Sequence, residues 1–131
     1  MIILDTCALI FDALTPEKLT AAAKKAITRA MEKNQLFCCD ISLWEIAMLI
    51  QKKRIDPSTD TKNFLELVLQ ARQIQTLPIT VEIAELAAAR SEYRHYDPAD
   101  RLIAASTINH HADLITSDKK LRDIPGLSII W

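Results

Sequence analysis

Glycine is almost absent from this chain of 131 residues, in which Gly126 is the only one. Dinucleotide-binding domains hold a phosphate in a loop with several glycines, because a backbone without side chains can approach the phosphate closely. The scarcity of glycine therefore argues against that class of protein.

Cysteines and long apolar runs are also scarce. There are three cysteines, two of them adjacent (Cys38 and Cys39), which suits neither a disulfide framework nor the paired ligand spacing of a zinc site. We expect buried free thiols in a reducing cytoplasm. No apolar run approaches the length of a membrane span, and the first residues lack the basic start and cleavage site of a signal peptide. We therefore expect a cytoplasmic protein with no membrane segment and no removed leader.

An excess of charge of one sign is missing as well. The formal net charge is −1, so binding to a nucleic acid would need a local basic patch. Apolar residues make up 50% of the chain and charged residues 25%, which is typical of a globular protein and argues against disorder. The length predicts a single domain over residues 1–131.

Short apolar runs alternate with amphipathic segments along the whole chain. The runs at 1–4, 36–39, 75–77, 112–116 and 127–130 predict buried strands. Helices are expected at 15–33, 41–54, 61–72, 80–91 and 97–110, with a short helical turn at 117–121. This alternation predicts an α/β fold, a three-layer α/β/α sandwich whose central parallel sheet is covered on both faces.

The segment from Asp97 to Ala105 opens the last long helix. Asp97 suits the N-cap and Pro98 the first helical position, while Asp100 falls in the first turn, where unsatisfied N–H groups favour a carboxylate. Capping alone explains such a pair of acids in most helices. Three other segments, however, deliver an acid to a similar place.

Four acids are expected at one edge of the sheet. Asp5 and Asp118 follow strands, and Glu45 and Asp100 lie in first helical turns that could reach the same edge. Four converging carboxylates repel one another, and Mg²⁺ or Mn²⁺, which prefer hard oxygen ligands, would relieve that repulsion. Such a site suits phosphodiester hydrolysis. Each acid also has a structural explanation: Asp5 or Asp118 could cap a turn, and Ser42 with Glu45 matches a capping box.

Several neighbouring residues are expected to assist. The small hydroxyls of Thr6, Ser42 and Thr116 suit the orientation of carboxylates or waters, although they are also ordinary turn residues. Asp97 has a possible auxiliary metal role beside capping. Arg101 could meet a phosphate or form an internal ion pair. We expect the tryptophans in the core or in an interface, and a basic set near an RNA backbone: Lys52, Lys53, Arg54, Lys119, Lys120 and Arg122.

Four segments resemble, in order, the signatures of the PIN domain, and more narrowly those of VapC-type ribonuclease toxins of prokaryotic toxin–antitoxin pairs. They are Ile3–Thr6, Ser42–Ile46, Asp97–Ala104 and Leu114–Asp118. The resemblance covers essentially the full chain. Its most specific part is the Asp-Pro-x-Asp-Arg segment followed by Thr-x-Asp.

The resemblance implies a metal-dependent endoribonuclease. Asp5, Glu45, Asp100 and Asp118 would bind Mg²⁺ or Mn²⁺ and support cleavage of RNA by an activated water. It also implies a homodimer and a cognate antitoxin whose tail covers the site. One departure is Lys53, because many relatives place a glycine before the basic residue there. That position lies at a helix end and is not catalytic.

Two other classes of protein also place acids in such a pocket. A PIN-like module could use the acidic pocket to bind metal or a protein tail without cutting RNA, although the presence of all four acids argues against a decayed site. A phosphoacceptor receiver domain also clusters acids at a sheet edge, but we find no good match to its phosphorylatable aspartate and its lysine.

Overall fold

Five short parallel strands form the centre of the protein, in a computed structural model that describes all residues 1–131. The strands are β1 (Ile2–Leu4), β2 (Leu36–Cys39), β3 (Gln75–Leu77), β4 (Asp113–Ile115) and β5 (Ser128–Ile130). They pair in the order β3-β2-β1-β4-β5, every pair parallel. The chain therefore builds outward from β1 to one side and then returns to build on the other, so the strand order reverses beside β1.

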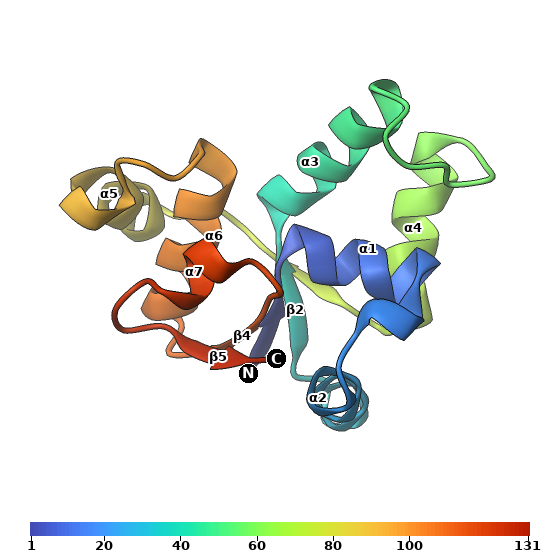
Figure 1. Cartoon of the computed structure of the whole chain (residues 1–131), viewed down its shortest axis with the longest axis horizontal. Coiled ribbons are helices and arrows are strands. Elements are labelled where there is room, and N and C mark those ends of the chain that lie inside the picture. Colours follow the sequence, from blue (N-terminus) through green and yellow to red (C-terminus); the bar gives the residue numbers. More distant parts are fainter.

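Helices cover both faces of this sheet (Figure 1). One apolar cluster joins the sheet to α1 (Thr6–Leu14), α2 (Ala21–Glu32), α3 (Asp40–Gln51) and α4 (Thr61–Ala71). A second joins the opposite face to α5 (Val81–Ala89), α6 (Pro98–Asn109) and α7 (Lys119–Arg122). The three-layer α/β/α sandwich predicted from the sequence is confirmed.

The alternation of strand residues explains why the strands read as continuous apolar runs. Ile3 packs in the second cluster and Leu4 in the first, and Leu114 and Ile115 divide in the same way. Successive side chains of a strand point to opposite faces, so a sheet covered on both sides needs an apolar residue at every position. All five predicted strands are present in the structure.

Two helices differ from the sequence expectation. The predicted helix at 15–33 is instead a 3₁₀ turn, Pro16–Lys18, followed by α2, which Thr20 caps through a bond from the Ala23 amide of 3.1 Å. The break falls at Leu19, which adopts an extended conformation and is buried in the core. α1 was not predicted, because Asp5 ends β1 and caps α1 with no intervening loop.

The scarcity of glycine shows at the carboxyl ends of four helices. Asn34, Lys53, Gln73 and His111 have φ values of 53°, 55°, 54° and 51°, in the left-handed region that usually takes glycine. After each one, the next amide closes back on the helix, as in the bond of 2.9 Å from the Arg54 amide to the Leu49 carbonyl. The chain thus makes these Schellman turns without glycine.

Some single side chains also differ from expectation. Cys7 is exposed, whereas Cys38 and Cys39 are buried free thiols as predicted. Trp44 is 58% exposed, so it does not lie in the core, and of the two predicted places for it only an interface stays a prediction. Trp131 packs on Phe11 with ring centroids 6.4 Å apart. None of the helices combines the length and apolar character needed to cross a bilayer.

Candidate active site

The predicted acids belong to elements that meet at the carboxyl edge of the sheet. β1 and β4 are neighbours and end at the same edge, so Asp5 follows one strand and Asp118 the other. The strand order reverses here, which is where open parallel sheets bind ligands. α3 and α6 bring Glu45 and Asp100.

Asp5 is the most buried of the acids, at 3% exposed. Its Oδ1 accepts a bond of 2.7 Å from the Ala8 amide, which caps α1, and its Oδ2 accepts from the Thr116 hydroxyl. Burial raises the pKa of Asp5 to about 6, aided by the charges of Asp118 and Glu45, while the two hydrogen bonds oppose that rise. The carboxylate is fixed in place but costly to ionise.

Glu45 lies one turn further into its helix than the sequence suggested. α3 begins at Asp40 directly after β2, so Ser42 is inside the helix and the capping-box interpretation of Ser42 and Glu45 is wrong. The Thr6 hydroxyl donates to Glu45 Oε1, and Thr6 Oγ1 also lies 3.0 Å from Ser42 Oγ. Thr6 and Ser42 are both buried, so Thr6, in contact with Ser42, holds Oε1 of Glu45 from the interior of the protein. Burial also raises the pKa of Glu45, as does the charge of Asp97.

Asp100 stands at the entrance of α6, as predicted. Asp97 caps the helix by accepting a bond of 3.0 Å from the Asp100 amide. Partial burial, followed by the charges of Asp97, Asp118 and Glu45, raises the pKa of Asp100 to about 7. The capping role of Asp97 is confirmed, and its charge acts on two of the other acids.

Asp118 is linked to Asp5 through Thr116. The Asp118 amide donates a hydrogen bond of 3.0 Å to Thr116 Oγ1, and the Thr116 hydroxyl in turn donates to Oδ2 of Asp5. Asp118 also caps α7, since its Oδ1 accepts from the Lys120 amide at 2.9 Å. One buried hydroxyl therefore holds two acids that come from neighbouring strands.

Cys7 marks the place where the four acids converge, and the sequence reasoning did not single it out. Its thiol follows Thr6 in the first turn of α1. Partial desolvation raises the pKa of this thiol to about 12, and the charges of Asp5, Asp118, Asp100 and Glu45 add to the shift. The first turn of α1 is therefore within electrostatic range of all four carboxylates. Only the position of Cys7 beside Asp5 and Thr6 could have indicated this.

The donor set suits a hard divalent cation, although the side chains are not gathered around one. No three acidic, histidine or cysteine side chains stand close enough together to ligate the same ion. The charges of Asp118 and Glu45 nevertheless add to the rise in the pKa values of Asp5 and Asp100, which is the repulsion that a cation relieves. Carboxylate oxygens are the ligands that Mg²⁺ and Mn²⁺ prefer, so the residues fit the predicted ions in kind.

One predicted assistant, Arg101, is placed elsewhere. The Arg101 guanidinium donates to the Ala87 carbonyl at 3.3 Å from Nε and 3.2 Å from the terminal nitrogen, which ties α6 to α5. Arg101 forms neither an internal ion pair nor a contact with the four acids. The two ion pairs of the structure are Arg72 with Asp12 and Arg90 with Glu92.

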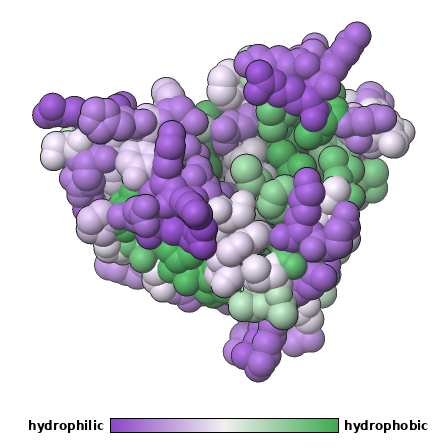
Figure 2. Space-filling model, viewed as in Figure 1, coloured by the Kyte–Doolittle hydropathy of each residue, from purple (hydrophilic) through white to green (hydrophobic).

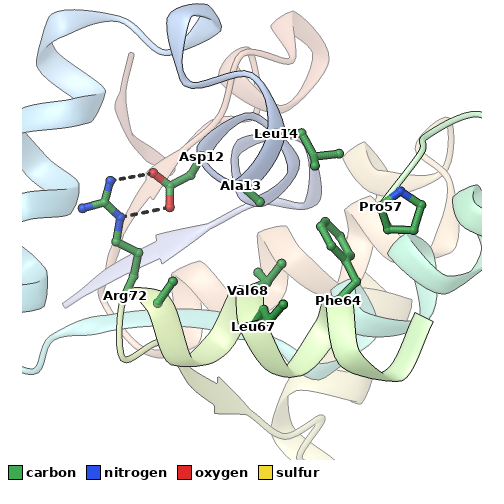
Figure 3. A pocket seen from close by; sticks show the side chains of 9 residues that line it. Asp12, Ala13, Leu14, Pro57, Phe64, Leu67, Val68 and Arg72 are labelled. Atoms are coloured by element: carbon green, nitrogen blue, oxygen red, sulfur yellow. Dashed lines mark hydrogen bonds and ion pairs between the residues drawn. The ribbon is translucent and has the colours of Figure 1, made fainter. Parts of the chain in front are cut away.

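A separate pocket of about 490 Å³ lies between α1 and α4 and contains none of the predicted site residues (Figure 3). Phe64, Leu67 and Val68 of α4 line one wall, and the bidentate pair between Arg72 and Asp12 closes one end. Since its only charged side chains, Asp12 and Arg72, are paired with each other and the rest of the lining is apolar, we assign it no catalytic part.

Comparison with known proteins agrees with this fold. The PIN domain family matches residues 2–127. Ribonuclease VapC22 of Mycobacterium tuberculosis is 33% identical over 121 residues, which make up 92% of this chain and 89% of that protein. VapBC2 from Rickettsia felis, bound to a DNA fragment from its promoter, gives a TM-score of 0.75 at 19% identity over 98% of this chain and 97% of that chain. A toxin–antitoxin complex from Klebsiella pneumoniae gives 0.63 at 23% identity, over 97% and 95%.

The sheet order, the acids at its carboxyl edge and the match over nearly the whole chain agree: this chain belongs to the PIN domain family. Within the family its similarity is to the VapC type, through VapC22. The resemblance read from the sequence is thereby confirmed. The solved structures, at 19% and 23% identity, support the fold.

Proposed function

We propose that this chain is the ribonuclease toxin of a toxin–antitoxin pair and that it hydrolyses RNA at the edge formed by Asp5, Glu45, Asp100 and Asp118. The observation that carries the proposal is the set of hydrogen bonds at the carboxyl edge of the sheet, in which Thr116 holds Asp5 and the Asp118 backbone and Thr6 holds Glu45, while the charges of Asp118 and Glu45 reach Asp100 and help to raise its pKa. A relative named as a ribonuclease, 33% identical over most of both chains, supports it.

The four carboxylates are the residues that would hold Mg²⁺ or Mn²⁺. When bound, such an ion lowers the pKa of a water and offsets the charge that develops on phosphate oxygens. The chain's own contribution is orientation: Thr116 holds Asp5 and the Asp118 backbone, and Thr6 holds Glu45. Single-stranded or looped RNA is the expected substrate, because its phosphates and bases are accessible.

A module that binds metal or a protein tail without cutting RNA is the alternative. Because no three ligating side chains stand at the distance of a shared ion, the form of this alternative that binds a protein tail is the one to test. The two functions differ in one measurable respect, because only the nuclease changes the length of an RNA.

The test is cleavage of labelled single-stranded RNA by purified protein, with Glu45→Gln compared with Glu66→Gln. Glu66 is an exposed residue of α4 outside the site, so its substitution removes the same charge from the surface. The proposal predicts cleavage by wild type and Glu66→Gln, and a loss of at least about 100-fold in Glu45→Gln. Equal cleavage by both variants would contradict it, and no cleavage by wild type would favour the binding module.

We also propose two protein partners. The solved relatives are named as VapBC and toxin–antitoxin complexes, which supports an antitoxin for this chain. If this chain is purified together with a small protein in a stoichiometric complex, and removal of that protein restores RNA cleavage, the antitoxin is established. The alanine-rich α5, with Val81 80% exposed, motivates a homodimer. A monomeric mass by light scattering at micromolar concentration would count against the dimer.

A further inference from the structure

A second cavity opens directly beside the acidic edge. It measures about 300 Å³ and lies between α3 and the segment that precedes α6. Its lining residues are Trp44, Glu45, Met48, Leu49, Lys52, Arg54 and Asp97. Glu45 belongs to both the cavity and the proposed catalytic edge, so whatever occupies the cavity touches the catalytic edge.

Trp44, Met48 and Lys52 recur every four residues and so share one side of α3. Trp44 is 58% exposed and has no aromatic or cationic partner, since the only ring pair joins Phe11 and Trp131. An exposed indole beside a cavity offers a flat apolar face. It is the kind of platform on which a nucleobase stacks.

The far end of the cavity is basic. Lys52 and Arg54 are exposed and take part in neither ion pair of the structure. The turn at Lys53 folds the chain back, through the bond from the Arg54 amide to the Leu49 carbonyl of 2.9 Å, and so returns Arg54 to the side of α3. Figure 2 shows hydrophilic side chains projecting over the tip of α3, above hydrophobic surface. The two cations are therefore free to meet an anion.

An RNA strand fits this order of groups better than a protein does. A run of acidic side chains would place negative charge against Glu45 and Asp97, and a run of basic ones would place positive charge against Lys52 and Arg54. RNA carries its negative charge only on the phosphates and leaves the bases uncharged, so its charge can meet the basic end while a base lies toward Trp44. An apolar segment would bury these four charges without partners, which is costly. A nucleotide instead offers an apolar ring to Trp44 and a phosphate to the two cations.

We propose that Trp44, Lys52 and Arg54 form a nucleotide subsite, in which the indole stacks on a base and the cations bind its phosphate, next to the bond that is cut. This subsite rests on the proposed ribonuclease function and adds to it a place where the RNA substrate binds beside the catalytic edge. The subsite does not distinguish one base from another, because it stacks on the base and makes no hydrogen bonds to the base edge.

The test uses the fluorescence of Trp44 alone, in a Trp131→Phe background, since the chain has only two tryptophans. A short single-stranded oligoribonucleotide is titrated in chelator, where cleavage is absent. We expect saturable quenching of Trp44. Binding by the variants is followed by the anisotropy of a labelled oligoribonucleotide, which needs no tryptophan, and should be about 5- to 100-fold weaker in Trp44→Ala and near-normal in Trp44→Phe. Inorganic polyphosphate, which carries charge without bases, should bind with no comparable quenching.

The basic end is tested with Lys52→Ala/Arg54→Ala against Lys24→Ala/Lys25→Ala, a matched pair of exposed lysines on α2. Only the first pair should weaken binding and lower the slope of log Kd against log salt, by about 1.4. Thermal melting of each variant excludes unfolding as the cause.

Failure of this subsite is distinguishable from failure of the proposed function. If wild type cuts RNA with Mg²⁺ while Trp44→Ala binds and cuts as well as wild type, the subsite is wrong and the nuclease stands. If that variant instead weakens only the dimer or the antitoxin complex, the face belongs to a protein and the subsite is overturned. If RNA quenches Trp44 but is never cut, the subsite stands and the nuclease fails.

Discussion

The hydroxyl of Thr116, at the end of β4, donates a hydrogen bond to the Oδ2 of Asp5, which lies 111 residues earlier at the end of β1. The same hydroxyl oxygen accepts a bond from the Asp118 amide at 3.0 Å. Thr116 is completely buried. It therefore holds in place two acids that the proposed reaction uses together.

Removal of this hydroxyl should destabilise the protein. In Thr116→Val the shape is kept, but the buried Asp5 carboxylate loses a donor and the Asp118 amide an acceptor, which costs about 1–3 kcal/mol. Urea unfolding measures this loss. Thr116→Ser keeps the hydroxyl and serves as the control, so equal losses in both variants would show that the methyl group matters rather than the bond.

Asp5→Asn should abolish cleavage while leaving the fold intact. Asparagine keeps an oxygen for the Ala8 amide, so the cap of α1 survives. The substitution removes one of the repelling charges, and the free energy of unfolding without metal at neutral pH should stay level or rise. Circular dichroism and an RNA cleavage assay on the same preparation check both parts. Full cleavage by a folded Asp5→Asn protein would sink the proposed site.

Without metal, the protein should lose stability as pH rises from about 4 to about 7. The pKa values of Asp5 and Asp100 rise to about 6 and about 7 in the folded protein, while an unfolded aspartate titrates near about 4. The folded state therefore binds more protons than the unfolded chain in this window, and the free energy of unfolding falls through it. We expect a decrease on the order of 2 kcal/mol, mainly from the buried Asp5.

Denaturant melts in chelator at several pH values measure this decrease, with Asp100→Asn as the comparison. The variant should show a shallower profile, and added Mg²⁺ at pH above 7 should raise the stability of wild type. A stability that increases steadily through the window would contradict the account of the four acids.

Lys53→Gly should stabilise the protein by about 0.5–1 kcal/mol. Lys53 has a φ of 55°, which costs a lysine more than a glycine at the end of α3. Lys25→Gly, inside α2, is the matched control and should destabilise by about 1 kcal/mol. Thermal unfolding distinguishes the two. Destabilisation by Lys53→Gly would mean that the lysine side chain contributes a contact not seen in the structure.

The sequence predicted the strands more securely than the helices, for a physical reason. Strands buried on both faces carry apolar residues throughout, so runs such as Leu36–Cys39 identify themselves. The break at Leu19 comes from burial of that side chain in the core, which no local pattern reports. α1 was missed because Asp5 was interpreted as the end of a strand only, although it also begins a helix.

The acids of the site and the small hydroxyls that orient them were predictable, but which hydroxyl pairs with which acid was not. Residues after β1 and β4 must share an edge in a parallel sheet, and this placed Asp5 and Asp118. The bonds from Thr6 to Glu45 and from Thr116 to Asp5 join residues 39 and 111 positions apart, so they depend on the folded arrangement. The capping box at Ser42 failed because a local pattern does not fix where a helix begins.

The most direct measurement is cleavage of labelled cellular RNA by the purified protein, with Mg²⁺ or Mn²⁺ against chelator, beside Asp100→Asn. The account predicts cuts that require the metal and that disappear in the variant, because Asp100 is one of the four acids that the cation would serve. Cuts that persist in chelator, or that Asp100→Asn makes as well as wild type, would contradict a metal-dependent nuclease at this edge.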